Sequence, residues 1–388
     1  MEKHQYKNIY FLRFVFAMVI VYCHFWLFTF IYQNPVFSFI NSHRNAPGLA
    51  VEFFFILSGF FFSYTLDINQ DIFAYIKKKL IRLWPVLAFY TLCLVCMDSW
   101  HMPAAQGNFY NRIYSLFLLN GIGITRGDTG VSWFVSALFF SSLFLFYLYK
   151  SCTAKTANLL LSIIVLFSYI ILINTGTISS RYEGLYGILP LPLLRAVGGM
   201  GLGIFLFYTY SNFNRNNLVR QKNNNGKLIY GFIETFLLIF SIYLVTCAKW
   251  PNEMIVIISF LALLYVFLLN KGLLSNLLNN NFSVAIGKYS YSIFLTHILV
   301  IYLVVYSLDL NSPFIANHAL LFIVLLCLTV IIVGVITYHF IEKPTNILFR
   351  KLGYYYYLVV LGAILIISSL SYIIYCLVSN SQSALPVI

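Results

Sequence analysis

The chain has 388 residues, of which 61% are hydrophobic, 19% are aromatic and only 9% are charged. Soluble domains carry about 25% charged residues, so this composition excludes a soluble globular protein. We expect a polytopic membrane protein with an all-α fold. The net charge of +13 requires no nucleic-acid partner, because basic inner loops and their attraction to anionic membrane lipids account for it.

Windows of about 20 apolar residues predict a membrane helical bundle with about 10–11 transmembrane helices. We expect a single domain over residues 1–388, with its core at about 8–345 and an additional transmembrane helix at about 355–378. The predicted spans are approximately 9–31, 47–66, 83–101, 131–150, 157–174, 191–210, 228–248, 252–270, 285–307, 318–340 and 355–378.

The distribution of basic residues predicts the orientation of these spans. If the N-terminus is cytoplasmic, 18 of the 24 lysines and arginines fall in inner segments and six fall in outer ones. This partition agrees with the positive-inside rule. We therefore expect a cytoplasmic N-terminus and an external C-terminus.

Arg13 and His24 lie in the first predicted span and are eleven residues apart. Eleven residues make about three helical turns, so the two side chains share one helix face about 16 Å apart along the axis. An ionisable residue inside a membrane span is costly and therefore indicates function. The structural alternatives are that Arg13 is an interfacial anchor and that His24 forms an interhelical hydrogen bond.

Glu52 lies near the start of the second predicted span, in the segment VEFFFILSGF, and His24 is expected at a comparable outer depth. A carboxylate at this depth must face protein or water. Because a carboxylate partner fixes the tautomer of an imidazole and raises its basicity, we expect Glu52 to orient His24 as a general base. A purely structural hydrogen bond between the two is the alternative.

A third cluster, KKKLIRLWP, lies at the predicted cytoplasmic end of the third span. Lys79 and Arg82 are three residues apart and are therefore neighbours on one helix face, with Pro85 expected within the first turns. These cations suit a phosphate-bearing ligand, because arginine binds phosphate bidentately and lysine acts as a point charge. Ordinary positive-inside charge would give nearly the same sequence.

A glycine-rich segment in the sixth predicted span could be mistaken for a phosphate-binding loop. No predicted strand precedes it, and it lies within an apolar helix. The four-residue spacing of Gly199 and Gly203 instead predicts close packing against another helix.

Together these segments resemble bacterial acyltransferase family 3, the integral-membrane acyltransferases that modify polysaccharides and other cell-surface glycans. The resemblance extends through most of the chain and implies a location in the bacterial inner membrane. In chain order it rests on the Arg13 to His24 spacing, VEFFFILSGF with Ser58 and Gly59, KKKLIRLWP, SWFVSALFF around Trp133, YSYSIFLTH ending at His297, and HFIEKP with Glu342 and Pro344.

The resemblance implies roles for these residues. His24 matches the family's catalytic base, Arg13 matches the essential companion of that base, and Lys79 with Arg82 matches the paired-basic contact for the acyl-CoA donor. Two positions depart from the family pattern. Lys79 stands where arginine is usual, which weakens a bidentate contact without removing its charge, and Glu52 stands where aspartate is common, which adds one methylene of reach.

The implied co-substrate is acyl-CoA, with acetyl-CoA as the first expectation; no permanently bound cofactor and no metal is expected. Its phosphates are expected on Lys79, Arg82 and Arg13, with the pantetheine arm directed toward His24. The expected acceptor is a hydroxyl of a cell-surface or lipid-linked glycan that enters from the outer side, and membrane lipids are the remaining partners.

Trp133, His297 and Glu342 are expected to line the site or to support it as scaffold. For Glu342, an ion pair with Lys343 or another basic neighbour at the helix end is the alternative. Whether a covalent acyl-histidine forms is left open.

Two functions from other classes remain alternatives, a polysaccharide polymerase and a glycan flippase or transporter. A transporter would be expected to show repeated halves and helices broken by glycine or proline. A polymerase would be expected to concentrate arginines in large outer loops. The sequence shows neither pattern, and only Arg112 and Arg126 lie in the longest predicted outer loop.

Overall fold

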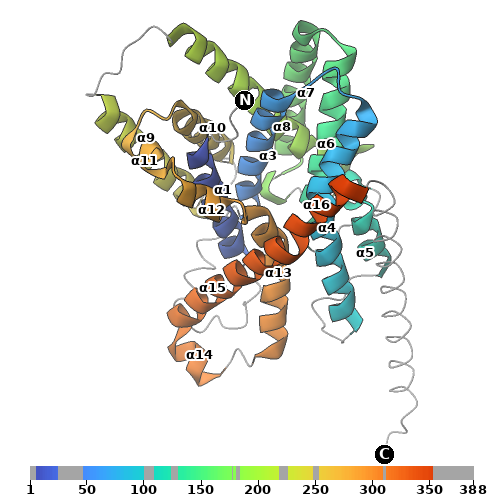
Figure 1. Ribbon diagram of the computed structural model, residues 1–388, viewed down its shortest axis with the longest axis vertical. Coiled ribbons are helices and arrows are strands. Elements are labelled where there is room, and N and C mark those ends of the chain that lie inside the picture. Colours follow the sequence, from blue (N-terminus) through green and yellow to red (C-terminus); the bar gives the residue numbers. More distant parts are fainter. Residues whose placement is uncertain are drawn as a thin grey trace, which may run out of the picture.

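The computed structural model describes residues 6–24, 47–99, 109–123, 130–176, 178–180, 184–217, 226–247, 253–308 and 312–352. These residues form a bundle of helices with one short hairpin (Figure 1). The longer helices are α1 (Lys7–Cys23), α3 (Ala50–Thr65), α4 (Ile72–Ser99), α6 (Ser132–Ser151), α7 (Ala154–Asn174), α8 (Leu191–Asn217), α9 (Gly226–Cys247), α10 (Glu253–Leu269), α13 (Ser290–Ser307) and α15 (Ala319–Thr337).

Shorter elements connect or extend these helices. The short α-helices are α5 (Phe109–Leu116), α11 (Leu273–Leu278), α12 (Asn281–Gly287), α14 (Pro313–Asn317) and α16 (Lys343–Leu352). Single 3₁₀ turns lie at Pro47–Leu49, Asn120–Ile122 and Ile178–Ser180, and a π-helix lies at Tyr338–Glu342. Strands β1 (Leu185–Tyr186) and β2 (Leu189–Pro190) pair antiparallel.

The helices confirm the predicted all-α membrane bundle. Within the described residues, seven helical segments are long and apolar enough to cross a membrane, and α3 and α10 are shorter apolar helices. Each of the first ten predicted spans overlaps a helix. The segment predicted at 9–31 is helical from Lys7 to Cys23, and its residues 25–31 lie outside the described residues. The predicted helix at about 355–378 also lies outside them.

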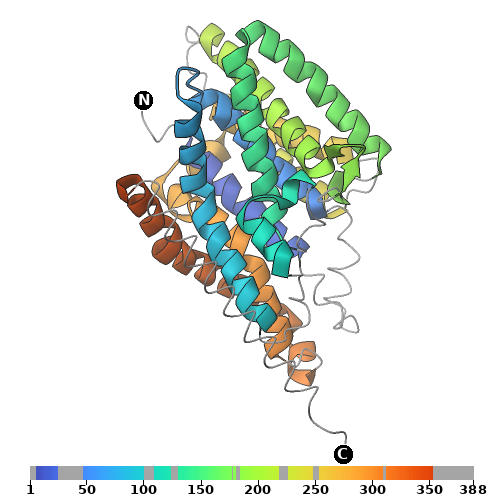
Figure 2. The same cartoon turned by 90° about the vertical axis from the view of Figure 1, so that its right-hand side faces the viewer.

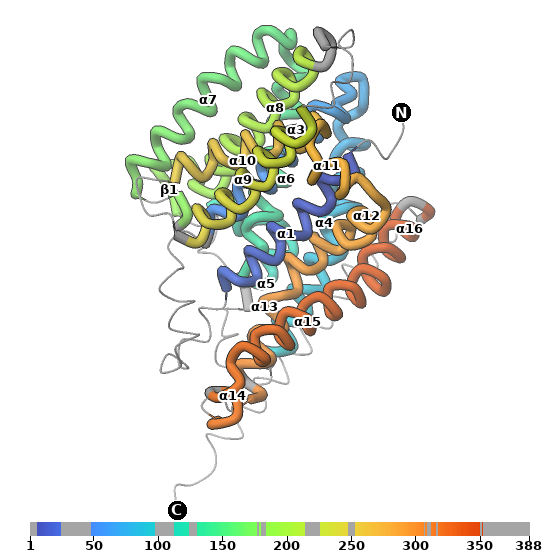
Figure 3. Tube along the Cα trace, turned by 90° about the vertical axis from the view of Figure 1, so that its left-hand side faces the viewer, coloured from blue at the N-terminus to red at the C-terminus, as the bar shows by residue number. Residues whose placement is uncertain are grey.

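Helices α1 and α3 occupy the centre of the bundle, with α9, α10 and α11 on one side and α6, α7 and α8 on the other (Figure 1). Helix α4 runs along α13 (Figure 2). Helices α13 and α15 pack together, and α15 continues into α16 as one long rod (Figure 3). The elements that carry the predicted site residues therefore meet around α1 and α3.

Glycines bring α3 and α8 into close contact. A Cβ atom on Gly59 of α3 would clash with the backbone of Met200, and one on Gly203 of α8 would clash with the backbone of Ile56. Gly199 lies against Phe55 in the same interface. The predicted close packing through Gly199 and Gly203 is thus confirmed, because small residues let two backbones approach.

The predicted inner ends of several helices lie together. At the start of α1, the ring of Tyr6 contacts that of Tyr64 at the end of α3, with centroids 5.6 Å apart, and its hydroxyl lies 3.4 Å from that of Tyr210 on α8. Lys7 donates to the side chain of Asn281 at the start of α12 over 2.9 Å. The structure therefore agrees with the predicted alternation of helix directions.

Helix α4 begins at Ile72, eleven residues before its predicted start, because hydropathy windows exclude the lysines of its first turns. The Asp71 carboxylate accepts hydrogen bonds from the amides of Phe73 and Ala74, at 2.8 and 3.1 Å, and so caps this end of the helix. Pro85 lies well inside the helix and not in its first turns, which corrects the sequence-based expectation.

The predicted span at 318–340 continues beyond its expected end. Helix α15 passes into the π-helix Tyr338–Glu342 and then into α16, where Phe349 is buried with its ring 6.4 Å from that of Trp84 on α4. Short π-helical segments within α-helices are often found at functional sites. This one contains Glu342 of the HFIEKP motif.

Candidate active site

A cavity of about 440 Å³ opens among α1, α3, α4, α6, α13 and the π-helix. Its size lies within the range of small-molecule sites. Its charged lining consists of five cations and one carboxylate: Arg13, Lys78, Lys79, Arg82, Lys288 and Glu342. The cations predicted to hold a donor therefore line one cavity, and Lys78 and Lys288 join them.

Aromatic rings contact three of these cations, Lys288 over Tyr289 and, in the same way, Lys79 and Arg13. The Lys79 Nζ atom lies 5.3 Å from the centroid of the Tyr75 ring, one turn earlier on α4. The Arg13 Cζ atom lies 5.4 Å from the centroid of the Tyr10 ring on α1. Such cation–π contacts orient a charge without neutralising it. The three cations thus remain available to an anionic ligand.

Glu342 lies beside these cations but is held by a hydroxyl group. Ser292 on α13 donates to Glu342 Oε2 over 2.5 Å. The structure thus gives this carboxylate a hydroxyl partner on α13. The adjacent Tyr291 donates to the carbonyl of Leu83 over 2.6 Å and ties α13 to α4.

The opposite end of the cavity is apolar and ends at three phenylalanine rings. Phe54 of α3, Phe134 of α6 and Phe294 of α13 line it there. The ring of Phe294 lies 6.2 Å from that of His297, one turn further along α13. The cavity therefore leads from a cationic mouth toward a fully buried histidine.

His297 is paired with His24, which follows the last residue of α1. The two rings lie 4.8 Å apart between centroids, and His297 Nε2 lies 3.2 Å from His24 Nδ1. His24 Nδ1 also lies 2.9 Å from the carbonyl of Ile20, and His297 Nδ1 lies 3.3 Å from that of Ile293.

The Nδ1 atom of each histidine faces a backbone carbonyl oxygen. A carbonyl oxygen can only accept, so each Nδ1 that faces one carries the proton. The one proton on His24 Nδ1 then lies within reach of two acceptors, the Ile20 carbonyl at 2.9 Å and His297 Nε2 at 3.2 Å. The structure therefore places an imidazole acceptor, His297 Nε2, beside the Nδ1 atom of His24.

Glu52 does not fill the place that the sequence predicted for it. Its Oε1 atom accepts from Arg195 Nε over 2.8 Å, and both side chains are fully buried. Arg195 also donates to the carbonyl of Gly48 over 2.9 Å. The expected orientation of His24 by Glu52 is therefore corrected, because the carboxylate faces α8, where an arginine neutralises it in a site that water does not reach.

Trp133 belongs to this ion-paired cluster and not to the cavity lining. The Arg195 Cζ atom lies 5.1 Å from the centroid of its ring, and the ring of Phe55 lies 6.3 Å away. Trp133 thus covers the guanidinium group as part of the scaffold. Arg195 was not among the residues predicted from the sequence. A usable signal existed, because this arginine lies one turn into an apolar span at a depth similar to that expected for Glu52.

In the described part of the chain, no group of three or more His, Cys, Asp and Glu side chains could hold a metal ion. A helical membrane bundle in which a polycationic cavity leads toward a histidine pair fits an enzyme that acts on an anionic substrate. Comparison with family models identifies which enzyme class this is. The model of the acyltransferase domain matches residues 6–339, so the chain belongs to acyltransferase family 3.

The family match includes α1 through α15 and therefore every element that lines the cavity except the end of the π-helix. No curated protein and no solved structure matches the chain. The protein is thus a membrane acyltransferase.

Proposed function

We propose that this acyltransferase moves an acetyl group from cytoplasmic acetyl-CoA to a hydroxyl of a cell-surface or lipid-linked glycan, in the bacterial inner membrane. The observation that carries the proposal is the cavity with a cationic mouth and an apolar end one helical turn from His297. A coenzyme A thioester has the same polarity, with phosphates at one end and a slender acylated arm at the other.

The phosphates bind at the mouth of the cavity. Arg82 supplies a bidentate contact, Lys79 a point charge, and Arg13 a further cation on the side toward His24. Arg13 and His24 share one face of α1 about 16 Å apart, which suits an extended pantetheine arm. The cationic mouth faces the cytoplasm in the orientation that the basic residues favour, with the N-terminus inside and the C-terminus outside.

His24 is the general base in this proposal. Its Nε2 atom removes the proton from the acceptor hydroxyl while the hydroxyl oxygen attacks the thioester carbonyl. A carbon–oxygen bond forms, the carbon–sulfur bond breaks, and the imidazolium gives its proton to the departing thiolate. The Ile20 carbonyl and His297 Nε2 both lie within hydrogen-bonding distance of His24 Nδ1 and orient the imidazole through that atom, so the transfer is assigned to Nε2.

Glu52 acts on this reaction by positioning, through its pairing with Arg195. The pair fixes the first turn of α3 against the first turn of α8. Phe54 at the end of the cavity is only two residues further along α3. The pair thus helps to position the helix that carries Phe54.

Reconstituted protein tests the proposal. Purified enzyme in lipid nanodiscs, given acetyl-CoA labelled in its acetyl group and glycan from cells that lack the gene, should form acetyl esters on the glycan. Cells without the gene should lose these esters while glycan chain length and export stay unchanged. Altered chain length or export with unchanged ester content would instead support the polymerase or the flippase, which the family match disfavours.

A further inference from the structure

We infer that Phe54, Phe134 and Phe294 form an aromatic gate that selects the length of the transferred acyl group. The inference rests on the proposed function, since it assumes that an acyl thioester enters the cavity. It adds residues that determine which acyl group is accepted. The charged lining and the histidine pair cannot make this selection, because they contact the phosphates and the reacting atoms and not the acyl chain.

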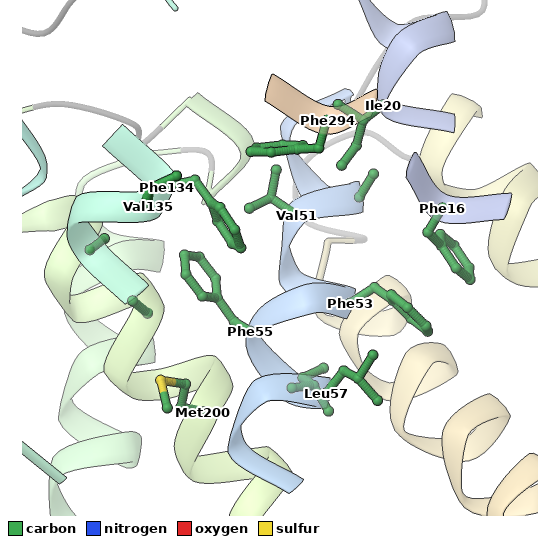
Figure 4. Packing of buried hydrophobic residues seen from close by; sticks show 14 of the residues in the cluster. Phe16, Ile20, Val51, Phe53, Phe55, Leu57, Phe134, Val135, Met200 and Phe294 are labelled. Carbon is green, nitrogen blue, oxygen red and sulfur yellow. The ribbon is translucent and has the colours of Figure 1, made fainter. Parts of the chain in front are cut away.

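The three rings close the apolar end of the cavity. Their centroids are 5.0 Å apart for Phe134 and Phe294, 6.4 Å for Phe54 and Phe294, and 6.5 Å for Phe54 and Phe134. Separations of this size are contact distances between aromatic rings. Figure 4 shows Phe134 and Phe294 facing each other across the space between their helices. The gate is therefore shut in this structure.

The histidine pair lies behind the gate. Among the described residues, the cavity lining includes all three rings but neither His24 nor His297. The gate ring Phe294 nevertheless contacts His297 directly. A thioester carbon that approaches His24 from the cationic mouth must therefore pass between the rings, and the acyl chain attached to it must lie against them.

The packing of the three rings is unequal. Phe134 is held by Phe55 at 4.7 Å as well as by Phe294, and both Phe134 and Phe294 are buried. Phe54 is only half-buried, and its two gate contacts are the longest. Phe54 is thus the ring that yields to an entering acetyl group. A longer chain would also have to displace Phe134 from a tight packing site, which costs more.

Substitution of Phe54 tests the inference. Full-length enzyme in nanodiscs is assayed with acetyl-CoA and with butyryl-CoA, and the ratio of the two kcat/KM values is the readout. Phe54→Ala is expected to raise the butyryl to acetyl ratio about 10-fold or more, since one or two methylenes can change discrimination by this much in an apolar pocket. Phe54→Leu should give a smaller increase in the same direction, and it serves if the alanine variant does not fold.

Phe61 provides the matched control, because it lines the same cavity seven residues, or about two helical turns, further along α3. Phe61→Ala should change both rates in the same proportion and leave the ratio unchanged. An unchanged ratio in Phe54→Ala and Phe54→Leu, or an equal change in Phe61→Ala, overturns the gate. Wild-type enzyme that transfers neither acyl group overturns the proposed function itself, which is a different result.

Discussion

At one end of the bundle, five cations and a single carboxylate line an open cavity, whereas at the other end Glu52 and Arg195 neutralise each other where no surface is exposed. The first arrangement leaves an excess of positive charge that a ligand phosphate can neutralise. The second leaves no net charge and fixes two helices. Charged residues in one membrane domain therefore serve binding in one region and architecture in the other, and only the distances between them distinguish the two uses.

The largest effect is expected at the pair of His24 and His297, which belongs to neither of these two regions. His24→Ala should lower acyl transfer by about 10²- to 10⁴-fold, the usual loss when a general base is removed. Thermal stability and the affinity for acyl-CoA should stay nearly normal, because the cationic mouth is unchanged. The measurement is single-turnover transfer from labelled acetyl-CoA by purified protein.

His318→Ala is the matched control, because this exposed histidine precedes α15 and stacks on Phe314 away from the cavity. It should transfer at the normal rate. If His24→Ala also transfers near the normal rate, His24 is only an interhelical hydrogen-bonding residue and the proposed mechanism is wrong.

The next largest effect is expected at the buried ion pair, and it tests whether this pair has a structural role. Arg195→Met leaves the Glu52 carboxylate buried without its partner, which should destabilise the protein by about 3–5 kcal/mol. The double variant Glu52→Gln, Arg195→Met carries no buried charge and should recover most of that loss. Thermal unfolding in detergent, followed by tryptophan fluorescence, measures both.

Arg82→Ala is the control for that experiment, because Arg82 is an exposed cation at the cavity mouth. Its unfolding should change by no more than about 0.5 kcal/mol, as is usual at a surface position. Equal destabilisation of Arg82→Ala and Arg195→Met would remove the distinction between a binding region and an architectural one.

At the donor end, Arg82→Ala should raise the KM for acyl-CoA about 10- to 100-fold, the value of a lost hydrogen bond to a charged group. Arg82→Lys should raise it less, because lysine keeps the charge but loses the planar fork. Lys155→Ala removes an exposed cation at the start of α7 and should leave the KM unchanged. Normal KM values in both Arg82 variants would show that these cations serve only membrane topology.

Local patterns predicted much of this molecule. Apolar windows located the first ten spans, and His24 directly follows α1, the helix that carries Arg13. The Lys79 and Arg82 pair was likewise identified correctly as one cluster, since residues three apart on a helix must be neighbours. Each of these inferences needed only one helix.

Contacts between distant segments could not be predicted in the same way. Arg195 pairs with Glu52 from 143 residues further along the chain, and hydropathy gives depth but not the direction in which a side chain points. For that reason the sequence assigned the carboxylate to His24 and left His297 as a general scaffold residue. The structure shows instead that the imidazole has an imidazole partner.

The smallest effect concerns that partner. His297→Leu removes the acceptor for His24 Nδ1–H and should lower kcat by about 2- to 13-fold, since a neutral hydrogen bond contributes about 0.5–1.5 kcal/mol. His297→Gln offers a side-chain oxygen near the former Nε2 position and should restore most of the rate, while the KM for acyl-CoA stays normal in both variants. A structural role alone would instead lower the stability of the two variants together and would give glutamine no advantage in kcat. Equal rates for leucine and glutamine would therefore contradict the proposal that His297 accepts a hydrogen bond from His24 and thereby keeps its basic nitrogen directed at the acceptor.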